Sequence, residues 1–234
     1  AGVNSAYVLA QRIVFSFIFC FAVILIKKRG GEIGRILKNK TERRRFFLCG
    51  ILISINWGVY ILTVAMGRIL ESSLAYYMNP LFSVLIGAVF FKEKLSTVQW
   101  TSVALAFAGV MFSVIRYGAV PYLAIIIALS FALYGALKKG IKAESETSIC
   151  METVSVLPIA LIFIAYAQFS GYTTFASLST AETLLLIATG PITSIPLMLF
   201  AKGIKETSIV TSGILMYINP TLQLLVGVLI YNEA

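Results

Sequence analysis

The tetrapeptides Tyr-Met-Asn-Pro at 77–80 and Tyr-Ile-Asn-Pro at 217–220 are the strongest indication of how this chain folds. Each lies inside a long apolar segment, where proline removes a backbone hydrogen bond from a helix. The shift of 140 positions that superimposes them aligns three further identical pairs, Ser72 with Ser212, Gly87 with Gly227 and Glu93 with Glu233. This ordered set of identities predicts an internal repeat.

The composition places the repeated segments in a membrane. Of 234 residues, 59% are hydrophobic and 12% charged, which is too little charge to cover a soluble domain. A helix needs roughly 20 residues to cross the hydrocarbon of a bilayer, and we predict eight such segments, at 6–26, 46–67, 74–91, 100–115, 120–139, 149–169, 184–204 and 209–230. The predicted fold is an all-α polytopic membrane helical bundle in one integral membrane domain, with residues 27–45 as a basic loop.

The 19 Lys and Arg residues predict the orientation of the bundle. All of them fall in alternate loops except Arg12, Arg68 and Arg116. An excess of positive charge marks the cytoplasmic side of a plasma-membrane protein, where it also contacts anionic lipid headgroups. The end at Ala1 is then external, and we expect the chain to be a piece of a longer protein. Because orientation accounts for the charge, no nucleic-acid partner is expected.

This orientation makes the repeat an inverted one, because segments 74–91 and 209–230 run in opposite directions. We predict a first half at 1–116 and a second half at 117–234. Inverted repeats with interrupted helices are typical of secondary transporters, which bind their solute near the repeat interface. The predicted function is movement of a small solute by alternating access. A passive channel and a membrane-embedded enzyme are the alternatives.

Each Asn-Pro segment has one polar helical face, with Asn79 and Ser83 in the first and Asn219 and Gln223 in the second. The prolines free backbone carbonyls, which membranes tolerate only beside protein or a watery cavity. Two interpretations remain open: the segments line one central cavity from opposite directions, or they are kinks that help helices pack.

Other polar residues inside the spans add candidates. Arg12 either faces the interior or extends outward to the interface. Asn56, Trp57 and Tyr60 lie in mid-span and fit an aromatic solute site or ordinary packing. Glu152 is the predicted proton-coupling residue, with a position among the headgroups equally open. The complete set of predicted substrate-binding residues is Arg12, Asn56, Trp57, Tyr60, Tyr76, Asn79, Pro80, Ser83, Tyr217, Asn219, Pro220 and Gln223.

The residue types argue against catalysis. The chain contains neither His nor Asp, which excludes Ser-His-Asp chemistry and His-based zinc sites. Cys20, Cys49 and Cys150 lie in or beside apolar segments and are interpreted as buried hydrophobic residues. We therefore predict no enzyme activity, no cofactor and no metal; the oligomeric state is not predicted.

The first Asn-Pro segment also carries a family resemblance. The runs RILESSLAYYMNPL (68–81), FFKEKL (90–95) and WTSVALAFAGV (100–110) resemble the RarD-like permeases of the EamA family, in the drug/metabolite transporter superfamily. The resemblance implies ten helices in two inverted halves, of which this chain holds helices two to nine, and transport of amino acids, other metabolites or drugs. The chain departs from the family pattern at Gln11, Met216 and Asn219, so the solute is not carried over.

Overall fold

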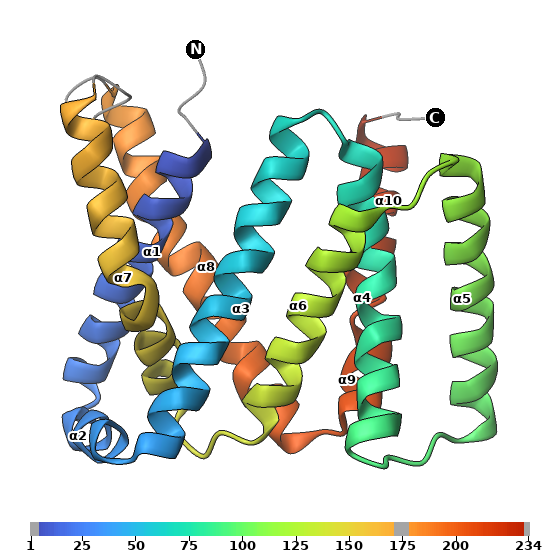
Figure 1. Cartoon of the computed structure of the whole chain (residues 1–234), viewed down its shortest axis with the longest axis horizontal. Coiled ribbons are helices and arrows are strands. Elements are labelled where there is room, and N and C mark those ends of the chain that lie inside the picture. The colour runs from blue at the N-terminus through green and yellow to red at the C-terminus, as the bar shows by residue number, and fades with distance from the viewer. Residues whose placement is uncertain (1–4, 171–177, 232–234) are drawn as a thin grey trace.

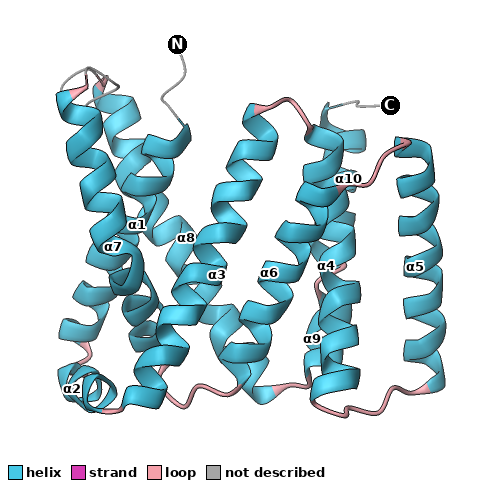
Figure 2. Cartoon of the chain, in the orientation of Figure 1, coloured by secondary structure: helices cyan, strands magenta, loops and turns pink. Residues whose placement is uncertain are grey.

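The computed structural model describes residues 5–170 and 178–231, without the side chains of 223, 224, 226–228, 230 and 231. The described part is a bundle of helices joined by short loops (Figure 2). The helices are α1 (Ser5–Ile26), α2 (Gly30–Lys38), α3 (Lys40–Ala65), α4 (Ile69–Phe90), α5 (Thr97–Tyr117), α6 (Tyr122–Lys139), α7 (Ser145–Phe169), α8 (Thr180–Glu206), α9 (Ile209–Leu215) and α10 (Ile218–Tyr231). The predicted all-α bundle is confirmed.

Seven of the described helices, α1 and α3 to α8, are long and apolar enough to cross a membrane. Two predictions need correction. The two Asn-Pro pairs predict an interruption of both their helices; segment 209–230 is interrupted between α9 and α10, but α4 continues through Pro80. Residues 27–45 are more than a loop, since they contain α2 and the first turns of α3.

Polar caps explain why several helices begin earlier than the apolar segments do. The Asn39 side chain accepts hydrogen bonds from Thr41 N at 3.0 Å and Glu42 N at 3.2 Å. Ser96 with Gln99 forms a capping box at the start of α5, and Ser179 with Glu182 does so at α8. These bonds satisfy the first backbone N–H groups of each helix, so a membrane helix extends beyond its apolar part.

The helices pack in two connected groups (Figure 1). In one group α1 packs against α7 and α8; in the other α4 packs against α6 and α9. Helix α3 joins them by packing on both α6 and α7. Helix α5 stands at one edge of the bundle in Figure 1, beside α4.

The helix boundaries repeat with the shift that aligns the Asn-Pro segments. Helices α3 and α8 begin at Lys40 and Thr180, and α4 and α9 at Ile69 and Ile209. Helix α7 begins at Ser145, which the same shift places on Ser5, the first described residue of α1. The packing repeats as well. A Cβ on Gly50 of α3 would lie 2.6 Å from the backbone oxygen of Glu152 in α7, and one on Gly190 of α8 would lie 2.6 Å from the backbone of Phe15 in α1. Equivalent glycines thus permit equivalent helix crossings in the two halves.

Candidate functional site

Helices α1, α3 and α4 bring four of the predicted site residues together around Arg12. The Arg12 guanidinium lies over the Trp57 ring, 5.8 Å from its centroid. The rings of Tyr60 and Tyr76 make an edge-to-face contact with centroids 5.8 Å apart, and both tyrosines lie close enough to interact electrostatically with Arg12. The result is a half-buried cation with three aromatic side chains as neighbours.

The Arg12 guanidinium has unused hydrogen-bonding capacity. Its Nε is buried without a hydrogen-bond partner, and no carboxylate within residues 5–170 and 178–231 forms an ion pair with it. Arg12 stands seven residues after Ser5, the first described residue of α1, which corresponds to about 10 Å along the helix axis. A cation at that depth needs a counter-charge or access to water.

Asn56 contributes to packing between α3 and α6. Its Nδ2 donates to the backbone oxygen of Ile127 at 2.7 Å and to Ser130 Oγ at 3.4 Å. The side chain is 9% exposed, so its amide holds two helices together rather than facing open space. Asn56 thereby fixes the position of the adjacent Trp57 on α3.

The first Asn-Pro segment lies in an unbroken helix, since α4 runs through Pro80. Pro80 and Ser83 are buried and face α9, where a Cβ on Gly213 would lie 3.1 Å from both the Pro80 carbonyl oxygen and the Ser83 Cβ. Ser83 Oγ donates to Asn79 Oδ1 at 3.5 Å, and Asn79 is half-buried. Part of the predicted cavity face is therefore a tight helix–helix contact.

The second Asn-Pro segment interrupts its helix. Tyr217 N donates to Ile214 O at 3.1 Å and Asn219 N to Met216 O at 3.2 Å, which are the tighter three-residue bonds of a 3₁₀ turn. Asn219 is exposed and Pro220 is buried. The side chain of Gln223 lies outside the described residues.

A tyrosine links the two repeated segments directly. The Tyr217 hydroxyl donates to the backbone carbonyl of Tyr77 at 3.2 Å, a bond between residues 140 positions apart. The inverted repeat therefore brings its two copies into contact, as a site at the repeat interface requires.

Glu152 belongs to a buried polar cluster between α6 and α7. Its side chain is paired with that of Lys138, and their side chains are 2% and 0% exposed. Ser148 Oγ accepts from Lys138 Nζ at 2.6 Å and donates to Glu152 Oε1 at 3.0 Å. The Tyr134 hydroxyl donates to Glu152 Oε2 at 3.0 Å. A buried charge is tolerable when it is paired and hydrogen-bonded in this way.

Lys138 is a site residue that was counted among the lysines of the loops. Its side chain is instead buried, because the last turn of α6 packs inside the bundle. A sequence signal was available. Tyr134 and Lys138 are four residues apart on α6, as are Ser148 and Glu152 on α7, so each pair shares a helical face.

Glu71 is a second buried acid within a membrane helix. The predicted segment began at residue 74 and therefore did not include it. Helix α4 begins at Ile69, because Glu71 is neutralised by an ion pair with Arg68. The Tyr117 hydroxyl donates to Glu71 at 2.5 Å. Hydrogen bonds to the hydroxyls of Tyr117 and Tyr122, with the charge of Glu71, raise the pKa of Arg68 in the loop before α4. This cluster joins the ends of α4, α5 and α6.

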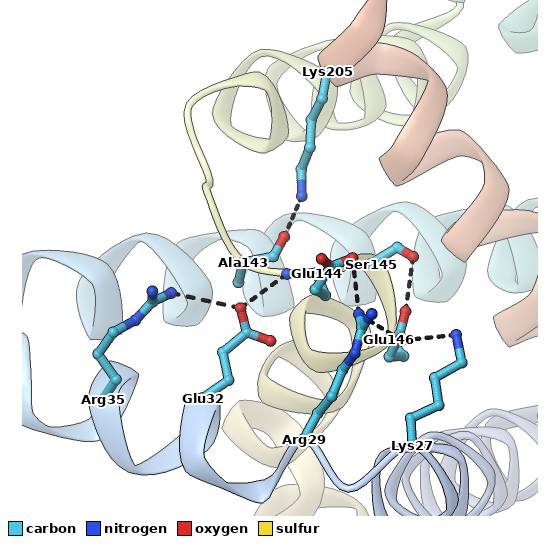
Figure 3. Close-up of polar contacts among 9 residues, drawn as sticks. All are labelled: Lys27, Arg29, Glu32, Arg35, Ala143, Glu144, Ser145, Glu146 and Lys205. Carbon is cyan, nitrogen blue, oxygen red and sulfur yellow. Dashed lines mark hydrogen bonds and ion pairs between the residues drawn. The ribbon is translucent and has the colours of Figure 1, made fainter.

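A charged network closes the opposite end of the bundle (Figure 3). Glu146 at the start of α7 pairs with Lys27 at 2.9 Å and with Arg29 at 3.0 Å. Arg29 also pairs with Glu144 at 2.9 Å, and a hydrogen bond to that carboxylate raises the pKa of Arg29. Lys205 donates to the carbonyl of Ala143. The network ties α1 and α8 to the beginning of α7.

Glu93 makes a further connection at that end. Its carboxylate accepts from Ile209 N at 2.9 Å and from Val210 N at 2.8 Å, and its Oε1 lies 3.6 Å from Lys139 Nζ. A carboxylate at the N-terminus of a helix satisfies free N–H groups and the helix dipole. Glu93, after α4, thereby holds α6 and α9 in place.

Arg12 and Glu152 are equivalent positions of the repeat. The 140-residue shift superimposes them on α1 and α7, and each is a charged group inside a membrane span. Ionisable residues within membrane helices mark pathways for solutes, ions or protons. A membrane transport protein is the class that this fold and these residues define.

Comparison with known proteins agrees with that class. The model of the EamA-like transporter family matches residues 1–115. The chain is 45% identical to "Uncharacterized transporter YojE" of Bacillus subtilis over 97% of this chain and 76% of that protein. It is 36% identical to "Protein RarD" of Streptomyces exfoliatus over 97% of this chain and 72% of that protein. A match to one crystal structure has a TM-score of 0.69 at 20% sequence identity and covers all of this chain and 81% of the chain in that structure. At this identity the match shows the fold alone.

The chain therefore belongs to the EamA-like transporter family. It is an integral membrane protein, and the names of its relatives point to a transporter rather than an enzyme.

Proposed function

We propose that the protein is a secondary transporter that moves a small organic solute across the plasma membrane by alternating access. The observation that carries the proposal is the equivalence of Arg12 and Glu152, two charged residues at positions related by the 140-residue shift, on helices that run in opposite directions. In an inverted repeat each half adopts, in turn, the conformation of the other. Family membership supports transport as the general class.

The solute site in this proposal lies around Arg12, Trp57, Tyr60 and Tyr76, between α1, α3 and α4. Asn79, Tyr217 and Asn219 line its continuation along the two Asn-Pro segments; the side chain of Gln223, predicted with them, lies outside the described residues. Asn56, Pro80 and Ser83 position these helices through the contacts between α3 and α6 and between α4 and α9.

Glu152 is the proposed proton-coupling residue. The charged and polar groups that face it are Lys138 and Tyr134 of α6 and Ser148 of its own helix, with the Cys20 and Cys49 thiols of α1 and α3 nearby. Proton transfer to the Glu152 carboxylate removes the charge that holds the Lys138 ammonium, so α6 and α7 lose an ionic contact. The conformational change would then depend on a proton gradient.

The orientation is part of the same proposal, with the basic loops cytoplasmic and residue 1 external. The network of Figure 3 and the Glu93–Lys139 contact then close the cytoplasmic end in the described conformation. Residues 1–116 and 117–234 are the two halves that move relative to each other.

Uptake into proteoliposomes tests the function. Labelled amino acids, nucleosides, hydrophobic drugs and carboxylates are offered with and without a pH gradient, and with unlabelled solute inside. We expect saturable uptake of at least one class, stimulated by internal solute. Glu152→Gln should lose gradient-driven accumulation and keep exchange, whereas Glu206→Gln, at an exposed glutamate, should behave as wild type. Uptake that never saturates and ignores internal solute would indicate a channel.

A further inference from the structure

The two equivalent charged positions differ in one respect that bears on the solute. Glu152 is neutralised inside the protein by Lys138. Arg12 has no such partner among the described carboxylates, and its buried Nε makes no hydrogen bond. Helices α3 and α4 face its guanidinium, and the side chains that they contribute are the uncharged Trp57, Tyr60 and Tyr76.

The two other buried acids within the described membrane helices are already paired. Glu71 is paired with Arg68 at one end of the bundle, and Glu146 is paired with Lys27 and Arg29 at the other. Both carboxylates therefore already have a counter-charge within the protein, and neither forms an ion pair with Arg12.

We infer that the solute itself supplies the counter-charge, and that it is an organic anion with one carboxylate and an aromatic or apolar body. This inference rests on the proposed transport function. A planar guanidinium presents parallel N–H donors that match the two oxygens of a carboxylate. The rings of Tyr60 and Tyr76 provide edges and faces on which a flat apolar body packs.

The same geometry favours a simple anion over an amino-acid zwitterion. An ammonium group bound beside Arg12 would add a second cation to a site in which no described acid is free to receive it. Like charges at short range inside a membrane are costly. We therefore expect 3-phenylpropanoate to bind better than phenylalanine, which differs from it by the ammonium group.

An anionic lipid headgroup carries related chemistry and is the other source of negative charge for Arg12. The lipid and the soluble carboxylate can be told apart, because the lipid can be left out of the detergent solution and because only the carboxylate carries an aromatic body. A lipid would act through its phosphate whether or not an aromatic carboxylate is present, so binding is measured in nonionic detergent with and without added phosphatidylglycerol.

The experiment is a thermal-shift titration of the purified protein. The probes are phenylacetate and 3-phenylpropanoate, each with its uncharged amide, and phenylalanine. A ligand that binds only the folded protein raises the unfolding midpoint with concentration, by roughly 3 °C at about ten times its Kd for a chain of this size. The variants are Arg12→Gln, Arg12→Lys and, as matched control, Arg116→Gln at an exposed arginine in α5.

We expect both carboxylates to raise the unfolding midpoint of wild type and of Arg116→Gln. The amides and phenylalanine should bind at least about tenfold more weakly. Arg12→Gln should lose the response to the carboxylates. Arg12→Lys should keep a reduced response, because it retains charge without the planar fork.

Equal responses to acid and amide, no response to either acid, or a response to phosphatidylglycerol alone would overturn the inference. The wild-type comparison of acid with amide decides the matter even if Arg12→Gln does not fold. Selective binding of the carboxylates without any transport in proteoliposomes would refute the proposed transport function and leave the anion site supported. Transport without a preference for the carboxylates would support the function and refute the anion site.

Discussion

Arg12 and Glu152 occupy equivalent positions of the two halves, but their surroundings are opposite in kind. Glu152 lies in a saturated cluster in which Lys138, Tyr134 and Ser148 engage both carboxylate oxygens. Arg12 lies among aromatic rings with an unused donor. The two halves thus carry a charged residue at the same position of the repeat. They differ in whether the protein or, as we infer, a ligand supplies its counter-charge.

The largest expected effect comes from removing the partner of Glu152. Lys138→Met leaves the carboxylate buried without a counter-charge, which costs about 3–5 kcal/mol. The thermal unfolding midpoint in detergent measures the loss. Lys142→Met, at an exposed lysine in the next loop, is the control and should change little.

The double variant Lys138→Met with Glu152→Met sharpens this prediction. Replacing both members of a buried pair by apolar residues is often neutral for stability, so we expect it to be more stable than Lys138→Met alone. Equal midpoints for Lys138→Met and Lys142→Met would show that the Glu152 cluster does not hold α6 to α7.

A smaller effect is expected from the paired glycine crossings. Gly50→Ala and Gly190→Ala each place a Cβ 2.6 Å from the backbone of a facing helix, and overpacking of this kind costs about 1–3 kcal/mol. Gly109→Ala in α5, where no other atom lies within 4 Å of the added Cβ, is the matched control. A loss of stability in only one of the two variants would contradict equivalent helix crossings in the two halves.

The contact between the two Asn-Pro segments should contribute less. Tyr217→Phe removes the hydroxyl that donates to Tyr77 O, and a hydrogen bond of this type contributes about 0.5–1.5 kcal/mol. Tyr77→Phe is the control from the equivalent position, because the acceptor is a backbone carbonyl that the substitution retains. A midpoint for Tyr217→Phe no lower than that of Tyr77→Phe would contradict a stabilising contact.

The smallest effect on stability is expected at Arg12. Because no described carboxylate pairs with it, Arg12→Met should leave the midpoint of the ligand-free protein unchanged within about 0.5 kcal/mol or raise it. This outcome is the opposite of that for Lys138→Met. A large loss of stability in Arg12→Met would mean that the guanidinium is satisfied within the protein.

The sequence predicted much of the fold because its strongest signals act along one helix. Apolar length and the alternation of basic loops located the membrane segments, and the repeated Asn-Pro pair indicated a shift that the starts of α3 and α4 follow. The apolar pattern could not show that Asn39, Ser96 and Ser179 begin their helices several residues earlier.

The candidate site was harder to predict because pairing between helices decides it. Lys138 has the same residue type as the lysines of the cytoplasmic loops, and only the packing of α6 on α7 distinguishes it. Glu71 was missed for the same reason, since its partners Arg68 and Tyr117 come from a loop and from α5. Asn56, a predicted solute ligand, donates to the backbone of α6, which periodicity alone does not reveal.

Distance measurements at both ends of the bundle test alternating access most directly. After replacement of Cys20, Cys49 and Cys150, spin labels are placed at Lys94 in the α4–α5 connection and Lys202 near the end of α8, or at Met66 after α3 and Ala181 in the first turn of α8, at the other end of these helices. The reconstituted protein is compared at mildly acidic and alkaline pH, with and without 3-phenylpropanoate. We expect one distance to lengthen as the other shortens. Distances that stay constant, or that change together in the same direction, would contradict a transporter whose two halves exchange conformations.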